Sequence, residues 1–297
     1  MFTATRMRLY SILLWAWVAA PLLQAHPGAA IAVAGDGRVF FVDTGGGIFS
    51  IHAGRVTRHE GPAYHWFAFD PQGRFRQTRW PSIPNGTIRT AGASPAMILS
   101  SDFPVTIGSD GSFYYPDGTS GRVRITRVTP SGATSVRATL PPMRSSGRDA
   151  PWVNGLAAGP GGSLYYTEDA AVRRVDAQGR VSAITTGVSV PNCTRIPGIE
   201  PEVGPYLRGL AVAADGSVYA AASGCGALLK IDPRGRVQTV LRTSPPWSPT
   251  DVTIANGEVY VLEYSHTSGE DRRQWFPRVR RISRTGVVTT LGGSNRR

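Results

Sequence analysis

A pattern of paired glycine turns recurs six times along this chain and constrains its fold more than any other feature. In each copy a turn glycine opens a short run rich in β-branched and aromatic residues, as in GDGRVFFVD at 35–43 and PGGSLYYTE at 160–168. A second turn glycine follows before the next copy begins. The two series alternate without exception, at residues 37/54, 73/86, 111/132, 162/179, 216/235 and 257/286. Because glycine or Asx-Gly turns between short apolar runs are hairpin signals, each unit should hold two tight turns.

Two hairpin turns in each unit predict an antiparallel meander of four strands whose first strand is rich in Gly and Ala. Small residues suit the innermost strand of a sheet that crowds with others around one axis, and radial repetition protects the strand edges. We therefore predict an all-β fold, a six-bladed β-propeller of four-stranded antiparallel blades. The second unit has the weakest strand signal, with RWPSIPNG between its turns. The expected blades span residues 29–60, 62–99, 102–140, 152–187, 206–243 and 249–292.

The N-terminus has the layout of a secretory signal peptide over residues 1–25. Two arginines precede an apolar run at 9–23, and Ala25 supplies the small residue at its end. The run is shorter than the roughly 20 residues that a bilayer-spanning helix needs, and Pro21 interrupts it. We expect cleavage after Ala25 and a mature propeller of residues 26–297 without a membrane span. A retained membrane anchor is the alternative.

Export would place the chain in an oxidising compartment, periplasmic or secreted. Cys193 and Cys225 are its only cysteines. Two cysteines in an exported chain are most simply one disulfide, whereas a thiolate metal site would need more ligands close by. The sequence therefore predicts a Cys193–Cys225 disulfide.

The charge of the chain is strongly basic. Loss of residues 1–25 removes two arginines and no acid, which lowers the formal net charge from +12 to +10. Such a balance suits a nucleic acid, an anionic polymer or a membrane surface as partner. No Lys/Arg run exceeds two residues, however, and the aromatic and Gly signature of an RNA-binding sheet is missing. We expect dispersed surface charge and no specific nucleic-acid partner.

Two segments carry a family resemblance. VNGLAAGPGGSLYYTEDAAVRRVDAQGRVSAI and GLAVAADGSVYAAASGCGALLKIDPRGRVQTV resemble NHL repeats, and the resemblance extends over nearly all of residues 30–292. It implies a six-bladed propeller. It leaves the function open, because propellers of this kind include lactonases, lyases, amidating enzymes and interaction modules.

The long loops of the expected propeller should gather at one end. Antiparallel blades place the glycine turns at one end and all other connections at the opposite end, where Cys193 and Cys225 also belong. Long loops in compact domains are usually functional, and these carry arginines and aromatic residues such as Trp152, His266 and Trp275. They predict a recognition face, with tolerated insertions as the alternative. The long segments are residues 75–84, 95–103, 141–153, 188–207 and 264–277.

Propeller enzymes place their chemistry at the axis, on residues that precede the innermost strands. The polar residues at or next to those positions in this chain are His65, Asp102, Asn154, Arg208 and Asp251. Gluconolactonase-like propellers, which residues 153–168 resemble, hold a divalent cation there with a Glu, two Asn and an Asp. Asn154 matches one of these ligands, but Arg208 stands in the place of the Asp and would repel a metal ion. We expect no cofactor, with Ca²⁺ on Asn154 as the alternative.

These residues predict a binding function more directly than a reaction. Streptogramin-lyase-like propellers, which the segment at 165–181 resembles, need a His and a Glu on adjacent late blades, whereas His65 and Glu168 belong to the second and fourth units. We therefore expect an exported, monomeric binding and interaction propeller whose long-loop face recognises a protein, a polymer or a small polar ligand. The alternative is a lactonase-like or lyase-like enzyme with a divergent axial site.

Overall fold

Among the residues that it describes, the computed structural model shows an all-β architecture with two single-turn 3-10 helices, η1 (Pro160–Gly162) and η3 (Ser223–Cys225). No helix in the part of the chain described below is long and apolar enough to cross a membrane. The expected signal peptide lies outside the described residues. The structure describes residues 30–43, 46–60, 67–69, 75–77, 97–99, 104–119, 122–142, 153–193, 196, 204–266 and 275–294.

Five sheets are four-stranded antiparallel meanders, as the paired turns predict. Sheet 1 contains β1 (Ile31–Val33), β2 (Val39–Asp43), β3 (Gly47–His52) and β4 (Arg55–Glu60). Sheet 3 contains β8 (Thr106–Ile107), β9 (Phe113–Thr119), β10 (Arg122–Val128) and β11 (Thr134–Thr139). Sheet 4 contains β12 (Gly155–Ala158), β13 (Leu164–Glu168), β14 (Ala171–Val175) and β15 (Val181–Thr185). Sheet 5 contains β16 (Leu207–Val212), β17 (Val218–Ala222), β18 (Ala227–Ile231) and β19 (Val237–Arg242). Sheet 6 contains β20 (Trp247–Ala255), β21 (Glu258–Ser265), β22 (Pro277–Ile282) and β23 (Val288–Gly293).

The second unit departs from the predicted meander. Its described strands form a three-stranded sheet, sheet 2, in the order β6 (Phe75–Gln77), β5 (Phe67–Phe69), β7 (Met97–Leu99). β7 contacts β1 and β8, so β5 is the central strand of sheet 2 and not its innermost one. The prediction used only the order of the turns. A strand that returns after a long connection can pair with either edge of β5, because no tight turn dictates its place.

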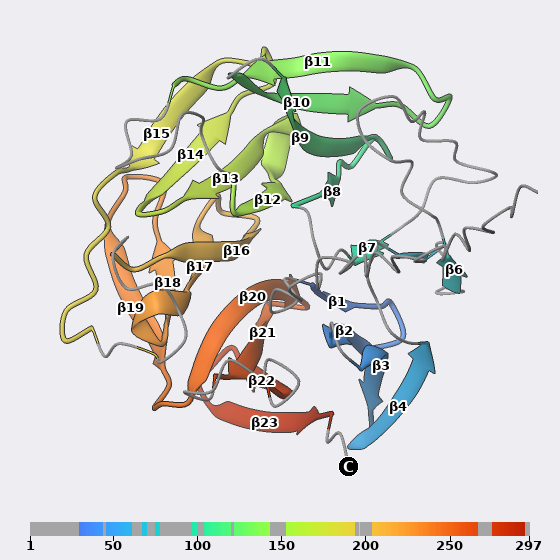
Figure 1. The fold of residues 1–297 in the computed structure, drawn as a ribbon, viewed down its shortest axis with the longest axis vertical. Helices are drawn as coiled ribbons and strands as arrows, with labels where there is room; N and C mark the ends of the chain where they lie inside the picture. Colours follow the sequence, from blue (N-terminus) through green and yellow to red (C-terminus); the bar gives the residue numbers. More distant parts are fainter. Residues whose placement is uncertain are drawn as a thin grey trace, which may run out of the picture.

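The sheets follow one another around a common centre, with the first strand of each four-stranded sheet and β7 of sheet 2 nearest to it (Figure 1). Sheets 1 and 6, from the two ends of the described chain, lie side by side (Figure 1). Three hydrogen bonds join them: Ile31 N–H donates to Asp251 over 3.1 Å, Tyr264 OH to the Val42 carbonyl over 2.5 Å, and Ser294 Oγ to Asp43 over 2.7 Å. The N-terminal and C-terminal sheets are therefore held together by polar contacts as well as by apolar packing.

Every described glycine of the two turn series adopts the left-handed conformation that the hairpins require. Their φ values lie between 70° and 88°. Gly179 and Gly235 also leave no room for a side chain, since a Cβ would stand 2.4 Å from the carbonyl oxygens of Arg137 and Ile184 in the preceding sheet. The glycine of the third-to-fourth-strand turn thus lets the neighbouring outer strand approach closely.

The core consists of apolar layers between adjacent sheets. Tyr114 and Ile125 of sheet 3 pack with Leu156 and Tyr166 of sheet 4, for example. Alternate residues of each middle strand belong to different layers, as expected where a sheet is covered on both faces. This packing holds the first strands around the centre, where the candidate site lies.

Candidate ligand site at the axis

A cavity of about 290 Å³ lies between the first strands of sheets 1, 3, 4, 5 and 6. Most of its wall consists of small and aliphatic residues, which are the residues that let several strands approach one axis. Asn154 and Asp251 are its most polar lining side chains, with Thr106 and Thr253. Its volume is near the lower limit for a small-molecule site.

Asn154 joins sheet 4 to sheet 5 beside this cavity. Its backbone N–H donates to the Thr167 carbonyl over 2.9 Å, and its Nδ2 donates to the Leu207 carbonyl over 2.8 Å. Because the nitrogen of the carboxamide donates to Leu207, the other terminal atom of the group is the acceptor oxygen Oδ1. That oxygen is buried and accepts no hydrogen bond from the described residues. A buried acceptor without a donor is unusual, and it marks Asn154 as a group with unused binding capacity.

Asp251 lies where sheets 1, 5 and 6 meet. One carboxylate oxygen accepts the Val252 N–H over 2.8 Å, and the other accepts the Ile31 N–H over 3.1 Å. Gly209 makes this placement possible, because a Cβ on it would stand only 1.9 Å from Asp251 Oδ1. The Asp251 carboxylate therefore occupies the space that any other residue at position 209 would fill.

Gly155 has the corresponding role one sheet earlier. A Cβ on it would stand 2.5 Å from the Arg208 carbonyl oxygen, which also accepts a hydrogen bond from Thr167 Oγ1 over 2.6 Å. Asn154, directly before β12, and Arg208, the second residue of β16, are thus each followed by a glycine against which the next sheet packs. The sequence contains this signal as NGLA and RGLA, but the pattern of turn glycines does not include these two glycines and so did not predict their role.

Burial dominates the electrostatics of the site. It raises the pKa of Asp251 from 3.8 to about 7, although the hydrogen bonds from Val252 and Ile31 and the positive charge of Arg208 favour the carboxylate. Desolvation outweighs these three contributions because the carboxyl group lies deep between strands. Asp251 is consequently able to accept or donate a proton near neutral pH, close to a permanent positive charge.

The structure describes three of the five predicted axial residues and brings them to one region. Asn154 and Asp251 line the cavity, and Arg208 precedes the lining residue Gly209. His65 and Asp102 lie outside the described residues. Among the described residues, no group of three or more His, Cys, Asp and Glu side chains is arranged to hold a metal ion. The expectation of no cofactor stays a prediction.

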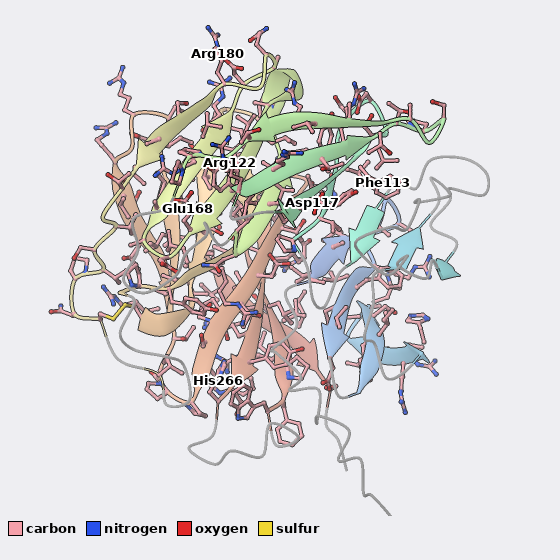
Figure 2. All side chains as sticks on the ribbon, turned by 45° about the horizontal axis from the view of Figure 1, so that its top comes forward. Phe113, Asp117, Arg122, Glu168, Arg180 and His266 are labelled. Carbon is pink, nitrogen blue, oxygen red and sulfur yellow. A yellow bond between two sulfur atoms is a disulfide. The ribbon has the colours of Figure 1, made fainter. Side chains whose placement is uncertain are left out.

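Two residues expected on the recognition face are buried. His266 and Trp275 expose 1% and 5% of their surface, and their rings lie 4.5 Å apart between centroids. Figure 2 shows His266 on the opposite side of the molecule from the outward-pointing Arg180. The prediction of exposed contact residues was wrong for this pair, because long-loop position alone does not reveal that an aromatic side chain folds back onto the sheet.

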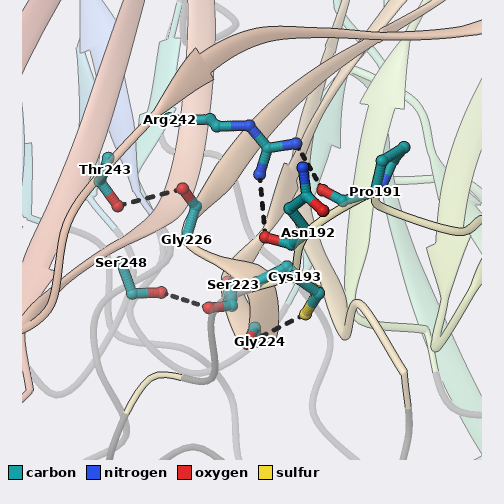
Figure 3. The surroundings of a disulfide bond; sticks show 10 residues. Pro191, Asn192, Cys193, Ser223, Gly224, Gly226, Arg242, Thr243 and Ser248 are labelled. Atoms are coloured by element: carbon teal, nitrogen blue, oxygen red, sulfur yellow. Dashed lines mark hydrogen bonds between the residues drawn. A yellow bond between two sulfur atoms is a disulfide. The ribbon is translucent and has the colours of Figure 1, made fainter.

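The predicted disulfide is present. Cys193, in the connection from sheet 4 to sheet 5, is bonded to Cys225 of η3, with a Cα–Cα distance of 4.7 Å (Figure 3). Cys225 lies between β17 and β18, so both cysteines are at the end of the molecule opposite the glycine turns. Of the predicted recognition face, the segment that contains Cys193 is therefore covalently anchored next to sheet 5.

Comparison with solved structures identifies the architecture. A streptogramin B lyase superposes with a TM-score of 0.51 at 14% identity, over 92% of this chain and 85% of that chain. A catalytically inactive virginiamycin B lyase from Staphylococcus aureus with quinupristin gives 0.50 at 14% identity, over 91% and 85%. A protein of unknown function from Bacteroides thetaiotaomicron gives 0.53 at 16% identity, over 79% and 67%.

Comparisons at the level of sequence add nothing to these likenesses. No protein-family model matches the chain, and no curated protein matches it. Identities this low carry information about fold alone. The lyases named above are propeller proteins, and the radial sheets of this chain are arranged as theirs are: the chain has a β-propeller fold.

Proposed function

We propose that this protein is an exported six-bladed β-propeller that binds a small polar ligand in its axial cavity. The observation that supports this most is the concentration of unused polar capacity at the axis. Among the described residues no donor reaches Asn154 Oδ1, and Asp251 is a carboxyl group with a pKa of about 7 in the same cavity. Convergent polar groups in a concave site are a general signature of ligand binding.

The chemistry of the wall indicates what such a ligand contains. A hydrogen-bond donor, such as an amide, hydroxyl or amino group, would satisfy Asn154 Oδ1. The carboxyl of Asp251 would accept a second donor in its ionised form, while the nearby Arg208 suits an acceptor or an anionic group. More of the cavity's exposed surface is polar than apolar, so backbone groups of the first strands would supply further hydrogen bonds. This combination describes a compact molecule with donors and acceptors at one end.

Export is supported by the disulfide, since such bonds persist in oxidising compartments. Six blades are supported by the six repeats in the sequence, of which five form four-stranded sheets and the second forms the shorter sheet 2. We propose a monomer, without a resident cofactor.

Ligand binding can be tested on the purified protein with a panel of sugar acids, amino acids, lactones and short peptides. Compounds that raise the melting temperature are then titrated by calorimetry. Asn154→Ala and Asp251→Asn should weaken binding at least about tenfold, which corresponds to roughly 1.4 kcal/mol. Asp232→Asn is the matched control, because Asp232 is a turn carboxylate paired with Arg236. A compound that binds both axial variants as tightly as it binds the unmodified protein would be shown to bind elsewhere.

One observation favours an enzyme as the second candidate. A carboxyl group with a pKa of about 7 is suited to general acid or base catalysis at neutral pH, and Arg208 could stabilise a developing negative charge. The lyase neighbours make streptogramin B and quinupristin reasonable first substrates to try. Mass spectrometry of incubated compounds would distinguish the two functions: turnover that disappears in Asp251→Asn supports the enzyme, and stable binding without product supports the binding protein.

A further inference from the structure

The 3-10 turn η3 lies between the two chain segments that enter the axial site. On one side, Ser223 N–H donates to the Tyr206 carbonyl over 3.1 Å, and Gly224 N–H donates to the Pro205 carbonyl over 3.0 Å. The approach is close, because a Cβ on Gly224 would stand 3.0 Å from the Gly204 carbonyl oxygen. Residues 204–206 are thus held against η3 immediately before β16 begins.

On the other side, η3 holds the beginning of β20. Ser223 Oγ donates to the Pro249 carbonyl over 2.5 Å, and Ser248 Oγ donates to the Ser223 carbonyl over 2.7 Å (Figure 3). Ser223 and Ser248 have no exposed surface. Buried hydrogen bonds of this kind define position sharply, because water cannot replace a lost partner.

Both attachments lie two residues before a residue of the axial site. Tyr206 is followed two positions later by Arg208, and Pro249 by Asp251. Two residues of chain span at most about 7 Å, so a displacement at η3 has only a short distance to travel to the site. Tyr206 also has a left-handed backbone, with φ of 45°, which is uncommon for a non-glycine residue and requires support from its surroundings.

The disulfide anchors this arrangement. Cys225 is the last residue of η3, and its partner Cys193 follows two residues that are themselves held, since Arg242 donates to the carbonyls of Pro191 and Asn192 over 2.5 and 3.4 Å (Figure 3). On the far side of η3, the Gly226 carbonyl accepts the Thr243 N–H over 2.8 Å. η3 is therefore connected to β19 through both the disulfide and the backbone.

We propose that η3 is the positioning element of the axial site, where Ser223 and Ser248 set the separation of Arg208 from Asp251 and the Cys193–Cys225 disulfide keeps η3 in place. This inference rests on the proposed ligand-binding function for its biological meaning, but its geometry is independent of any ligand. None of these four residues needs to touch the ligand. Their effect passes through the ends of β16 and β20.

The test measures the ionisation of Asp251 in the protein without ligand, by ¹³C NMR of the side-chain carboxyl. Ser248→Ala, Ser223→Ala and the double variant Cys193→Ser/Cys225→Ser should each shift the pKa of Asp251 by about half a pH unit or more, since Arg208 and the Ile31 N–H would sit differently around it. Ser217→Ala is the control, because Ser217 is a buried serine of sheet 5 whose hydroxyl donates to Asp215 of its own turn. It should leave this pKa unchanged.

The outcomes separate positioning from general stability. A lower melting temperature with an unchanged pKa of Asp251 in the serine variants would overturn the proposal, because a merely structural turn produces that result. If the double cysteine variant does not fold, the pKa of Asp251 in Ser248→Ala and Ser223→Ala, which retain the disulfide, tests the proposal. Ligand titration of the unmodified protein is read separately, so a failure of the binding function leaves the pKa result intact.

Discussion

Replacing Asp251 by Asn should change how the stability of this protein depends on pH. Asp251 is a carboxyl group whose folded-state pKa of about 7 lies above the ordinary value of 3.8. Its proton is therefore held more tightly in the folded chain than in the unfolded chain. The stabilisation that comes from this proton is fully present below about pH 4 and is lost as the pH rises to about 7. This direction is the opposite of that for an aspartate in an ion pair.

The size of the effect follows from the shift. A difference of about three pH units corresponds to about 4 kcal/mol between acid and neutral solution, as an upper limit. Asn cannot ionise, so the variant should lack this slope. It also has a fixed penalty: if its oxygen accepts the Val252 N–H, its amide group faces the Ile31 N–H, and the lost bond costs about 1–3 kcal/mol at every pH.

Urea unfolding of both proteins at intervals between pH 4 and pH 8 measures this directly. We expect the difference in unfolding free energy, unmodified protein minus Asp251→Asn, to fall by 1 to 4 kcal/mol over this range and to level off above pH 8. Subtracting the two curves cancels contributions from the turn aspartates, whose pKa values are lowered. A difference that does not vary with pH would refute the assignment of a raised pKa to Asp251.

Three further substitutions examine the contacts around the site and between the sheets. Gly209→Ala should lower the unfolding free energy by at least about 1–3 kcal/mol and displace Asp251, because its Cβ would stand 1.9 Å from the carboxylate. Gly35→Ala is the control in the same thermal melts, since a Cβ there would have nothing within 4 Å. Arg278→Ala should lower the unfolding free energy by about 3–5 kcal/mol and raise the pKa of Glu263 further, because Arg278 Nε is 2.5 Å from this fully buried carboxylate. A decrease below about 1 kcal/mol in chemical unfolding would mean that the ion pair does not stabilise the fold. Tyr166→Phe should lower the unfolding free energy by about 1–3 kcal/mol, because it removes a buried hydroxyl that interacts with the Glu168 carboxyl group, and an unchanged value would show that this contact contributes nothing.

Much of the fold could be predicted because its signals are local. A hairpin turn needs a positive φ within a few residues of the strands it joins, and glycine supplies it at low cost, so Gly37 and Gly54 already mark two of the three turns in sheet 1. Repetition then adds what a single unit lacks, since six similar units can only bury their faces against one another. Sheet 2 shows the limit, because a long connection specifies neither the partner nor the edge of β7.

The candidate site was predictable only in part. Asn154, Arg208 and Asp251 could be located because each precedes, or begins, the stretch that forms an inner strand. Their chemistry could not be read from that position. The state of Asn154 and the raised pKa of Asp251 depend on atoms from neighbouring sheets. Asn154 bonds to Leu207, more than 50 residues away in the chain, and Asp251 accepts a bond from Ile31, 220 residues away.

By itself, the sequence determined the repeat, the four-stranded meander in five units and the pairing of two cysteines, because these follow from backbone requirements and composition that act over short distances. Only the tertiary structure decided which residues meet at the axis and in what state. Gly209 admits the carboxylate of Asp251, η3 joins the ends of β16 and β20, and His266 turns inward against Trp275. Each of these results from packing between sheets, which brings together residues that no local pattern relates.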